Sequence, residues 1–297
     1  MKIGLIGLDN GHATMFAERL NDPLHQDYVE GGKIIAGFPG ESKYLPFTVD
    51  NADRLVPILR DRYEIEILAS IEAVAEAADA LIIASADGRT HRDQFAAIAP
   101  FRKPVFIDKF LCLSSQHATN IIRTAEKSDT PLFSSSPWRY AAPLVTALGD
   151  ASGGDITGAE FYGPLPEESA HPGFLWWGIH LAEPLFTALG PGCNEVLAVP
   201  GKLHSLAIGL WSDGRVGTIR GYHYDSSVRH GIIHRENTAQ RVDLNAEKHH
   251  SRHHLTKEVL NFFETKLTPV DLSITSEIIR FVEATEQSRK TGEAVRL

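Results

Sequence analysis

Two side chains in this sequence have the type and setting to move a proton. Lys109 follows the apolar run 103–108, and an amine at a strand tip can donate to a hydroxyl or carbonyl oxygen and relay a proton if its pKa falls. His180 and Glu183 are three residues apart, which puts a potential general acid/base and a carboxylate on one helical face. The ordinary alternatives are a solvated surface lysine and a core-edge histidine that bonds to a backbone carbonyl.

The stretch "GLDNGH" at 7–12 could hold a phosphate. A buried strand, a glycine turn and a helix predict a dinucleotide fingerprint G-x-G-x-x-G, but Asp9 replaces its second glycine and His12 its third. Gly7 and Gly11 still allow close backbone approach, and the helix start offers N–H groups to an anion. The Asp9 carboxylate either repels a pyrophosphate or turns away to cap the helix near His12, and the sequence leaves both open. A plain strand-to-helix connection is the alternative.

The end of the second expected strand, "GFPGESK" at 37–43, lacks the acid that NAD enzymes use for the ribose hydroxyls. Ser42 and Lys43 could instead receive a 2′-phosphate, which leans the prediction from NAD to NADP. A plain surface loop is the competing interpretation.

Histidines gather at 249, 250, 253 and 254, with i,i+4 pairs that could bind a metal adventitiously. No acid accompanies them at ligand spacing, so an exposed helix start is the preferred interpretation and no metal site is predicted.

The elements that position these groups alternate in the first half of the chain. Strands are predicted at 2–8, 32–38, 80–86, 103–109 and 131–136, and helices at 12–22, 51–63, 71–80, 90–100 and 114–129. Buried strands separated by helices indicate a Rossmann-type doubly wound parallel sheet, which binds ligands at the carboxyl ends of its strands. That rule selects residues 9–12, 38–40, 86–89 and 108–110.

The second half has a different pattern. Strands are predicted at 154–164 and 231–245, and a hairpin at 204–224 turns at Ser212-Asp213-Gly214. Helices are predicted at 177–190, 253–266 and 276–292. This pattern favours a mostly antiparallel sheet with helices on one face. The change near Pro137 predicts two domains, 1–136 for NAD(P) binding and 137–297 for substrate and oligomerisation.

Bulk properties exclude several classes of protein. The 297 residues carry a net charge of −9 with a pI of about 5.9, which argues against nucleic acid or an anionic membrane as partner. No signal peptide or membrane-spanning run is expected. Cys112 and Cys193 lie far apart and are expected to be buried reduced thiols, which fits a cytoplasmic location.

In their order along the chain, these motifs resemble the Gfo/Idh/MocA oxidoreductases. "KIGLIGLDNGH" resembles the first turn of that family, "DALIIASADGRTH" its fourth-strand motif with His91 at the histidine, and "KPVFIDKF" its E-K-P motif. "WWGIHLAEPLFTALG" resembles its central helix, which carries a catalytic histidine. The C-terminal stretch 277–297 is similar as well, so the resemblance covers nearly the whole chain.

The resemblance implies NAD(P)-dependent hydride transfer on a sugar, polyol or related carbohydrate carbon. Lys109 and His180 match the family's proton-handling residues, and Arg139, Trp177 and Glu183 join His180 as expected substrate contacts. The E-K-P motif reads Asp108-Lys109-Phe110 here, and Trp176 replaces an acid. Asp9 and Trp176 are the departures that weaken a simple dehydrogenase assignment. The expected cofactor contacts are Gly7, Leu8, Asp9, Asn10, Gly11, His12, Phe38, Pro39, Ser42, Lys43, Ser85, Ala86, Asp87, His91, Asp108 and Lys109.

Two other functions remain open. One is a non-catalytic dinucleotide- or sugar-binding regulator on the same fold, which Asp9 and Trp176 favour. The other is a metal-dependent lyase or hydrolase that uses His180, Glu183 and a third ligand. In each case we expect a homo-oligomer, because strands 204–224 would place several apolar residues on the outer face of the C-terminal sheet.

Overall fold

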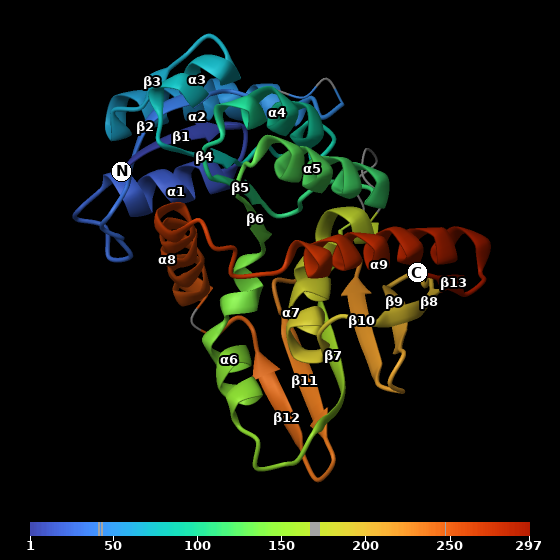
Figure 1. Cartoon of the computed structure of the whole chain (residues 1–297). Coiled ribbons are helices and arrows are strands. Elements are labelled where there is room, and N and C mark those ends of the chain that lie inside the picture. Colours follow the sequence, from blue (N-terminus) through green and yellow to red (C-terminus); the bar gives the residue numbers. More distant parts are fainter. Residues whose placement is uncertain (41, 43, 167–172, 247) are drawn as a thin grey trace. The chain divides into compact units, whose positions relative to one another are not determined.

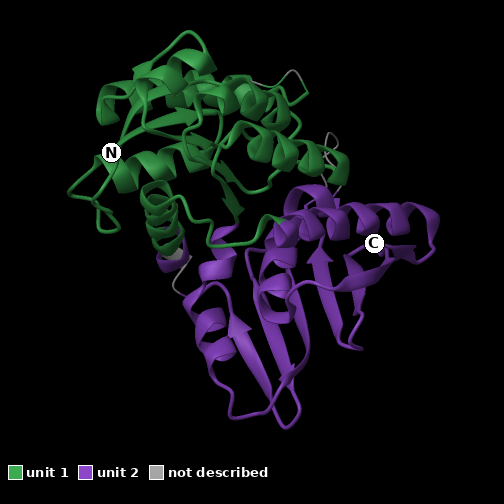
Figure 2. Cartoon of the chain, viewed as in Figure 1, with its two compact units in different colours: residues 1–135, 253–272 green, residues 136–252, 273–297 purple. Residues whose placement is uncertain are grey.

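The structure, a computed structural model, describes residues 1–40, 42, 44–166, 173–246 and 248–297, without the side chains of 248 and 249. The chain divides into two compact units, coloured in Figure 2. Unit 1 comprises residues 1–135 and 253–272, and unit 2 comprises 136–252 and 273–297. The first change of unit lies beside the boundary expected at 136/137, and a late segment of the chain groups with unit 1.

Unit 1 is built on a six-stranded parallel sheet in the order β3-β2-β1-β4-β5-β6 (Figure 1). Strands β4 to β6 are buried at every position, which explains their unbroken apolar runs. The predicted doubly wound sheet is therefore confirmed; the sequence analysis missed only the two-residue β3. The strands are β1 (Lys2–Ile6), β2 (Lys33–Phe38), β3 (Glu66–Ile67), β4 (Ala80–Ile83), β5 (Val105–Asp108) and β6 (Leu132–Ser135).

Helices link these strands, and α3 and α5 each begin at a serine cap. Ser70 accepts a hydrogen bond from the amide of Ala73, and Ser114 accepts one from the amide of His117, as expected of serine caps. Helix α1 contacts α2, whereas α3 contacts α4 and α4 contacts α5. The helices are α1 (Gly11–Asn21), α2 (Phe47–Tyr63), α3 (Ile71–Ala77), α4 (His91–Ile98), α5 (Ser115–Ser128) and α8 (Lys248–Thr265), with a 3-10 turn η1 (Ala99–Phe101).

A row of phenylalanine rings explains why residues 253–272 group with unit 1. Phe16 of α1 contacts Phe106 of β5, which contacts Phe133 of β6, with ring centroids 6.1 and 5.1 Å apart. Phe262 of α8 completes the row at 5.5 Å from Phe133. All four rings are fully buried, so α8 covers part of the sheet face that α1 also covers.

Unit 2 contains a seven-stranded sheet in the order β12-β11-β7-β10-β9-β8-β13. Its neighbours are antiparallel except for β7 and β10, which confirms a mostly antiparallel sheet. The predicted hairpin is β9 and β10, but β8 and β13 were not predicted. The strands are β7 (Ile156–Pro164), β8 (Cys193–Val199), β9 (His204–Trp211), β10 (Val216–Tyr222), β11 (His230–Arg235), β12 (Ala239–Asp243) and β13 (Val295–Arg296).

Helices α7 (Ile179–Leu189) and α9 (Leu272–Thr291) cover one face of this sheet, as expected. Phe186 of α7 and Phe281 of α9 meet edge to face at 5.5 Å, and a Cβ on Gly217 of β10 would lie 2.9 Å or less from Leu185 and Leu189. Unit 2 also contains the 3-10 turn η2 (Pro137–Tyr140), the unpredicted α6 (Ala142–Gly149) and one π turn, η3 (Phe174–Gly178), directly before α7.

Cys112 and Cys193 are both buried, and neither is in a disulfide, as expected. Among the described residues, no helix combines the length and apolar character needed to cross a membrane.

Candidate functional site

Asp9 lies beneath the turn that follows β1, and neither expected orientation is observed. Its side chain is fully buried, and Oδ1 accepts hydrogen bonds from the amide of Ala86 at 2.9 Å and from Asn10 Nδ2 at 3.0 Å. The helix cap is Asn10, whose Oδ1 accepts from the amide of His12. The expectation that Asp9 caps α1 is therefore wrong; its carboxyl joins the ends of β1 and β4. Burial raises the pKa of Asp9 to about 7.

The two glycines of this turn have different surroundings. Gly7 has a φ of +93°, and a Cβ there would lie 2.1 Å from the Ser85 amide nitrogen, so only glycine fits. Gly11 is exposed at the start of α1, and no atom lies within 4 Å of where its Cβ would be. A phosphate group therefore has open access to the backbone at Gly11, with the Asp9 carboxylate turned inward. The residues present fit a dinucleotide at this turn.

The end of β2 offers less to a cofactor than expected. The carbonyls of Phe38 and Pro39 accept hydrogen bonds from the amides of Gly7 and Leu8, at 2.9 and 2.7 Å. Ser42 is buried, and its hydroxyl donates to Asp87. That contact removes the expected role of Ser42 in holding a 2′-phosphate, and Lys43 lies outside the described residues. The lean to NADP has no support in the described structure.

Ser85, Ala86 and Asp87 lie in the loop that follows β4. Burial alone would raise the pKa of Asp87, but hydrogen bonds from Arg89 and Ser42 outweigh it and hold the pKa below its usual range. Ser85 Oγ accepts from Gln94 Nε2 at 2.9 Å. These side chains order the loop through contacts within unit 1.

His91 holds two strand ends together. It is fully buried on α4, with Nδ1 3.0 Å from the carbonyl of Phe110 and Nε2 2.9 Å from that of Ser85. Burial lowers its pKa. Both ring nitrogens are thus used within the protein, so His91 can reach a cofactor only through the backbone it positions.

His12 and Asp108 form a close pair at the carboxyl edge of the same sheet. His12 Nδ1 lies 2.7 Å from Asp108 Oδ2, and the side chains are 19% and 4% exposed. Burial alone would raise the pKa of Asp108, but the charges of His12 and Lys109 hold it below its usual range. Lys109 follows directly and is partly exposed, with a cis peptide bond to Phe110. The edge therefore carries an ionised carboxylate beside a histidine and a lysine.

Unit 2 contributes a separate group of polar side chains around His180. His180 is 7% exposed on α7, its Nδ1 lies 3.2 Å from Ser136 Oγ, and its ring centroid lies 5.5 Å from that of Trp177. Glu183, one turn later, accepts a hydrogen bond from Arg139 Nε at 2.6 Å. His180 and Glu183 both lie on α7, one turn apart, as expected. The Glu183 carboxylate, however, binds the Arg139 guanidinium.

One nitrogen of the Arg139 guanidinium can donate a hydrogen bond to a ligand. Its Nη2 is buried and makes no hydrogen bond with any described residue. Because a buried guanidinium nitrogen normally has an acceptor, this atom suits an oxygen of a bound ligand.

A second arginine contributes to this group. The Arg229 guanidinium lies 5.0 Å from the ring centroid of Trp138 and 5.8 Å from that of Trp177. Burial lowers the pKa of Arg229. Sequence reasoning gave no role to Ser136, Trp138 or Arg229; the strand-end rule applied to β6 would have found Ser136, but no local signal marks Arg229.

The histidine cluster has a structural contact. His253 Nδ1 lies 3.1 Å from the carbonyl of Asp27, and the side chain of His249 is outside the described set. Across the described residues, no three His, Cys, Asp or Glu side chains come together as metal ligands.

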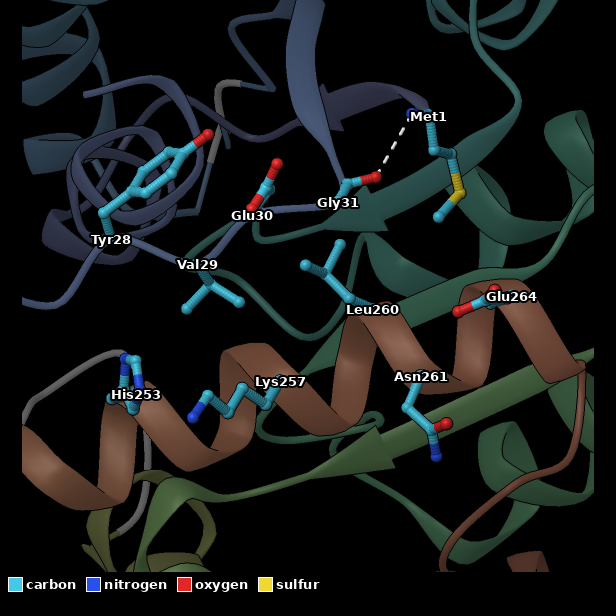
Figure 3. Close-up of a pocket in the computed structure, with 10 residues that line it drawn as sticks. All are labelled: Met1, Tyr28, Val29, Glu30, Gly31, His253, Lys257, Leu260, Asn261 and Glu264. Carbon is cyan, nitrogen blue, oxygen red and sulfur yellow. Dashed lines mark hydrogen bonds between the residues drawn. The ribbon is translucent and has the colours of Figure 1, made fainter. Parts of the chain in front are cut away.

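A hollow lies at the opposite, amino edge of the unit 1 sheet, between α8 and the segment before β2 (Figure 3). Met1 donates from its ammonium to the carbonyl of Gly31 at 3.1 Å on one side, and α8 presents Lys257 and Glu264 on the other. Charges of both signs line the hollow, and its position away from the strand tips separates it from the predicted site. The lining residues are Met1, Tyr28, Val29, Glu30, Gly31, His253, Lys257, Leu260, Asn261 and Glu264.

No protein-family model matches the sequence, and no curated protein matches it. Solved structures do match over the whole chain. The myo-inositol 2-dehydrogenase of Lactobacillus plantarum aligns at a TM-score of 0.83 and 15% identity, covering 100% of this chain and 99% of that one. The scyllo-inositol dehydrogenase of Lactobacillus casei, solved with NAD(H) and scyllo-inositol, aligns at 0.81 and 14%, covering 100% and 98%. A probable dehydrogenase of Thermotoga maritima aligns at 0.79 and 18%, also covering 100% and 98%.

Likeness at these identities shows the fold. The chain has the fold of the Gfo/Idh/MocA-type oxidoreductases, with a parallel N-terminal sheet and a mixed C-terminal sheet, as the sequence resemblance implied.

Proposed function

We propose that this protein is an NAD-dependent oxidoreductase that acts on a hydroxyl-bearing carbon of a polyol, sugar or related carbohydrate. The proposal depends mainly on the inward position of the Asp9 side chain. It leaves the turn open at Gly11, although Asp9 and His12 replace two glycines of the dinucleotide fingerprint. The fold of inositol dehydrogenases, one of them solved with NAD(H), supports the choice of cofactor and substrate class.

Unit 1 would hold the cofactor at the turn 7–12 and at the ends of β4 and β5. When bound, the nicotinamide would supply the acceptor or donor of a hydride. Lys109, next to the ionised Asp108, would hold the substrate oxygen and exchange its proton. In this proposal unit 1 supplies the residues for cofactor binding and Lys109 for the reaction.

Unit 2 would bind the carbohydrate. The Arg139–Glu183 pair fixes a guanidinium whose buried Nη2 suits a hydroxyl oxygen, and Trp177 offers an aromatic face to a sugar ring. His180, whose Nδ1 lies 3.2 Å from Ser136 Oγ, would contact a hydroxyl of that carbohydrate. These roles fit an uncharged, oxygen-rich substrate.

Calorimetry with NAD and NADP tests the cofactor first, and failure to bind either one would end the proposal. Turnover is then followed as formation of reduced nicotinamide with a panel that includes myo-inositol and scyllo-inositol. Lys109→Ala should lower kcat about 100-fold or more, the usual contribution of a proton-transfer group. Lys127→Ala, an exposed lysine on α5, is the matched control and should leave kcat unchanged.

A non-catalytic regulator is the second candidate, favoured by Trp176 at the place of the family's acid. It predicts cofactor binding that Lys109→Ala does not change and no turnover across the panel. A metal-dependent lyase or hydrolase is a weaker candidate, because Glu183 contacts Arg139.

The open face of the unit 2 sheet supports a homo-oligomer. Leu197, Val199, Leu210 and Val216 are each 37% to 46% exposed on β8, β9 and β10, and Leu210 pairs with Val216 across the strands. We propose that this face packs on a second copy. Leu210→Glu should reduce the mass found by light scattering, whereas Leu24→Glu, at a 96% exposed leucine of unit 1, should not. A monomeric wild-type mass would contradict the proposal. The cytoplasm is the proposed compartment, based on the two buried thiols.

A further inference from the structure

The pair of His12 and Asp108 resembles the close carboxylate–imidazole pairs of general acid/base catalysts. A carboxylate oxygen 2.7 Å from Nδ1 favours a proton on that nitrogen through its charge, which leaves Nε2 as the nitrogen that can exchange a proton with a ligand. Asp108 is 3% exposed as a residue, so its charge is only weakly screened by water. The acid is thus a fixed partner, and the histidine is the part of the pair that can change charge.

The imidazole reaches the surface although the acid does not. The His12 side chain is 19% exposed, compared with 4% for Asp108, and it belongs to the first turn of α1 beside the open Gly11. Carboxyl edges of doubly wound sheets are where ligands bind. A proton acceptor at this place can meet a ligand, which the fully buried His91 cannot.

Two other histidines of unit 1, His91 and His25, have contacts that serve the structure. His91 contacts only backbone carbonyls through its two nitrogens, and burial lowers its pKa. His25 lies 4.0 Å from Glu18, near the far end of α1, and its Nδ1 accepts from the amide of Asp27. Only the pair of His12 and Asp108 combines a short contact, a buried acid and a partly exposed ring among these three.

We propose that His12, oriented by Asp108, is a further acid/base residue of the oxidoreductase reaction, an inference that rests on the proposed function. In the oxidation direction the substrate O–H bond breaks and its proton goes to the Lys109 amine, which passes one of its own protons to His12 Nε2. The electrons of that bond form the C=O bond, while the carbinol hydrogen leaves with its electron pair as the hydride. Asp108 is a positioning residue that stabilises the resulting imidazolium, and Lys109 holds the substrate oxygen.

The charged groups around the imidazole decide how its titration is interpreted. Asp108 ends β5 and Lys109 follows it, Asp9 and Asp87 lie in the loops after β1 and β4, and the charge of Asp108 also acts on His91 of α4. Substitution of Asp108 alone removes the nearest of these charges.

The first experiment needs no substrate. The pKa of His12 is measured from histidine ring signals by NMR, with His12→Gln to assign the signal. In Asp108→Asn the His12 pKa should fall by about 1 unit or more, the usual effect of losing a close opposite charge. Asp213→Asn, at an exposed acid in the β9–β10 turn, is the matched control. An unchanged His12 pKa in Asp108→Asn would overturn the inference.

The second experiment measures the pH profile of kcat with NAD and the inositol panel. His12→Gln should lower kcat about 100-fold or more and remove the acidic limb of the profile, and Asp108→Asn should shift that limb to lower pH. His25→Gln should match the wild type. A turnover and profile unchanged by His12→Gln would overturn the inference and leave the proposed function intact.

The remaining outcomes separate the two proposals. Wild-type protein that binds no nicotinamide cofactor overturns the proposed function and this inference together. Cofactor binding without turnover across the panel supports the regulator and overturns the catalytic role of His12.

Discussion

Two close ion pairs with a buried acid, His12–Asp108 in unit 1 and Arg139–Glu183 in unit 2, differ in their cation. In unit 1 the partner of Asp108 is a histidine, and in unit 2 the partner of Glu183 is an arginine. The acid side chains are 4% and 6% exposed, and the cations 19% and 14%. Since arginine keeps its proton and histidine can release it, similar burial supports a fixed charge in one unit and a titratable one in the other.

The largest effect is expected from unit 2. Glu183→Gln leaves the Arg139 guanidinium in its buried place without a counter-charge, which it cannot relieve by losing a proton. The free energy of unfolding should fall by about 3 to 5 kcal/mol, measured by urea denaturation. Glu160→Gln removes an acid from a half-exposed pair with His234 and should change stability little. Equal losses in both variants would show that the Arg139 pair behaves like a surface pair.

Asp9 gives a further test in unit 1, because the hydrogen bonds described for its carboxyl come from an amide and an asparagine and not from a cation. Because burial raises its pKa from 3.8 to about 7, the folded protein binds this proton more tightly than the unfolded chain. Stability is therefore lost as pH rises from about 4 to about 7, and above that range the folded protein carries the full cost of a buried carboxylate.

Asp9→Asn removes that cost. The variant should match the wild type near pH 4 and be more stable by about 4 kcal/mol near pH 8, measured by denaturation at both pH values. A constant difference between the two would show that the carboxyl does not titrate in this range. Asp213→Asn, at an exposed acid, is the control and should show no such gain at high pH.

A smaller loss is expected when the acid of the unit 1 pair is removed. In Asp108→Asn the imidazole can remain neutral, so no buried charge is stranded and the free energy of unfolding should fall by only about 1 to 2 kcal/mol at pH 7. The Asp108 pKa is held below its usual range, so this contribution exists above the unfolded pKa and is lost as pH falls through the folded one. A loss as large as that of Glu183→Gln would remove the distinction between the pairs.

The smallest effect should come from Ser136→Ala, which removes the hydroxyl 3.2 Å from His180 Nδ1. One neutral hydrogen bond contributes about 1 kcal/mol. The measured pKa of His180, read by NMR, should change less than that of His12 in Asp108→Asn. A larger pKa change at His180 than at His12 would mean that Ser136 influences its histidine more than Asp108 does.

Much of the fold could be predicted because local patterns determine it. The apolar runs of β4 to β6 and the serine caps of α3 and α5 are signals within a few residues. The strands β8 and β13 were missed because they carry alternating or very short patterns beside glycine and proline. The place of α8 depends on Phe262 meeting Phe133, a contact that no local pattern encodes.

The residue types of the candidate site could be predicted from the sequence, but which side chains contact one another could not. Asp9 and Asn10 are both good capping residues, and only the extended backbone of Asn10 makes it the cap. Helical spacing suggested a partnership of His180 and Glu183, but Arg139 from η2 provides a stronger partner. His12 and Asp108 are far apart in sequence, so only the parallel sheet brings them together.

The return of residues 253–272 to unit 1 has a consequence for synthesis. A ribosome releases the chain from its N-terminus, so the six strands emerge long before α8 does. Until then Phe133 lacks the ring that covers it, and the nascent sheet exposes an apolar strip while all of unit 2 up to residue 252 is translated. Unit 1 is therefore translated first but can complete its core only after residues 253–272 have been made. A chaperone that binds nascent apolar surface would bind the sheet of unit 1 during that interval.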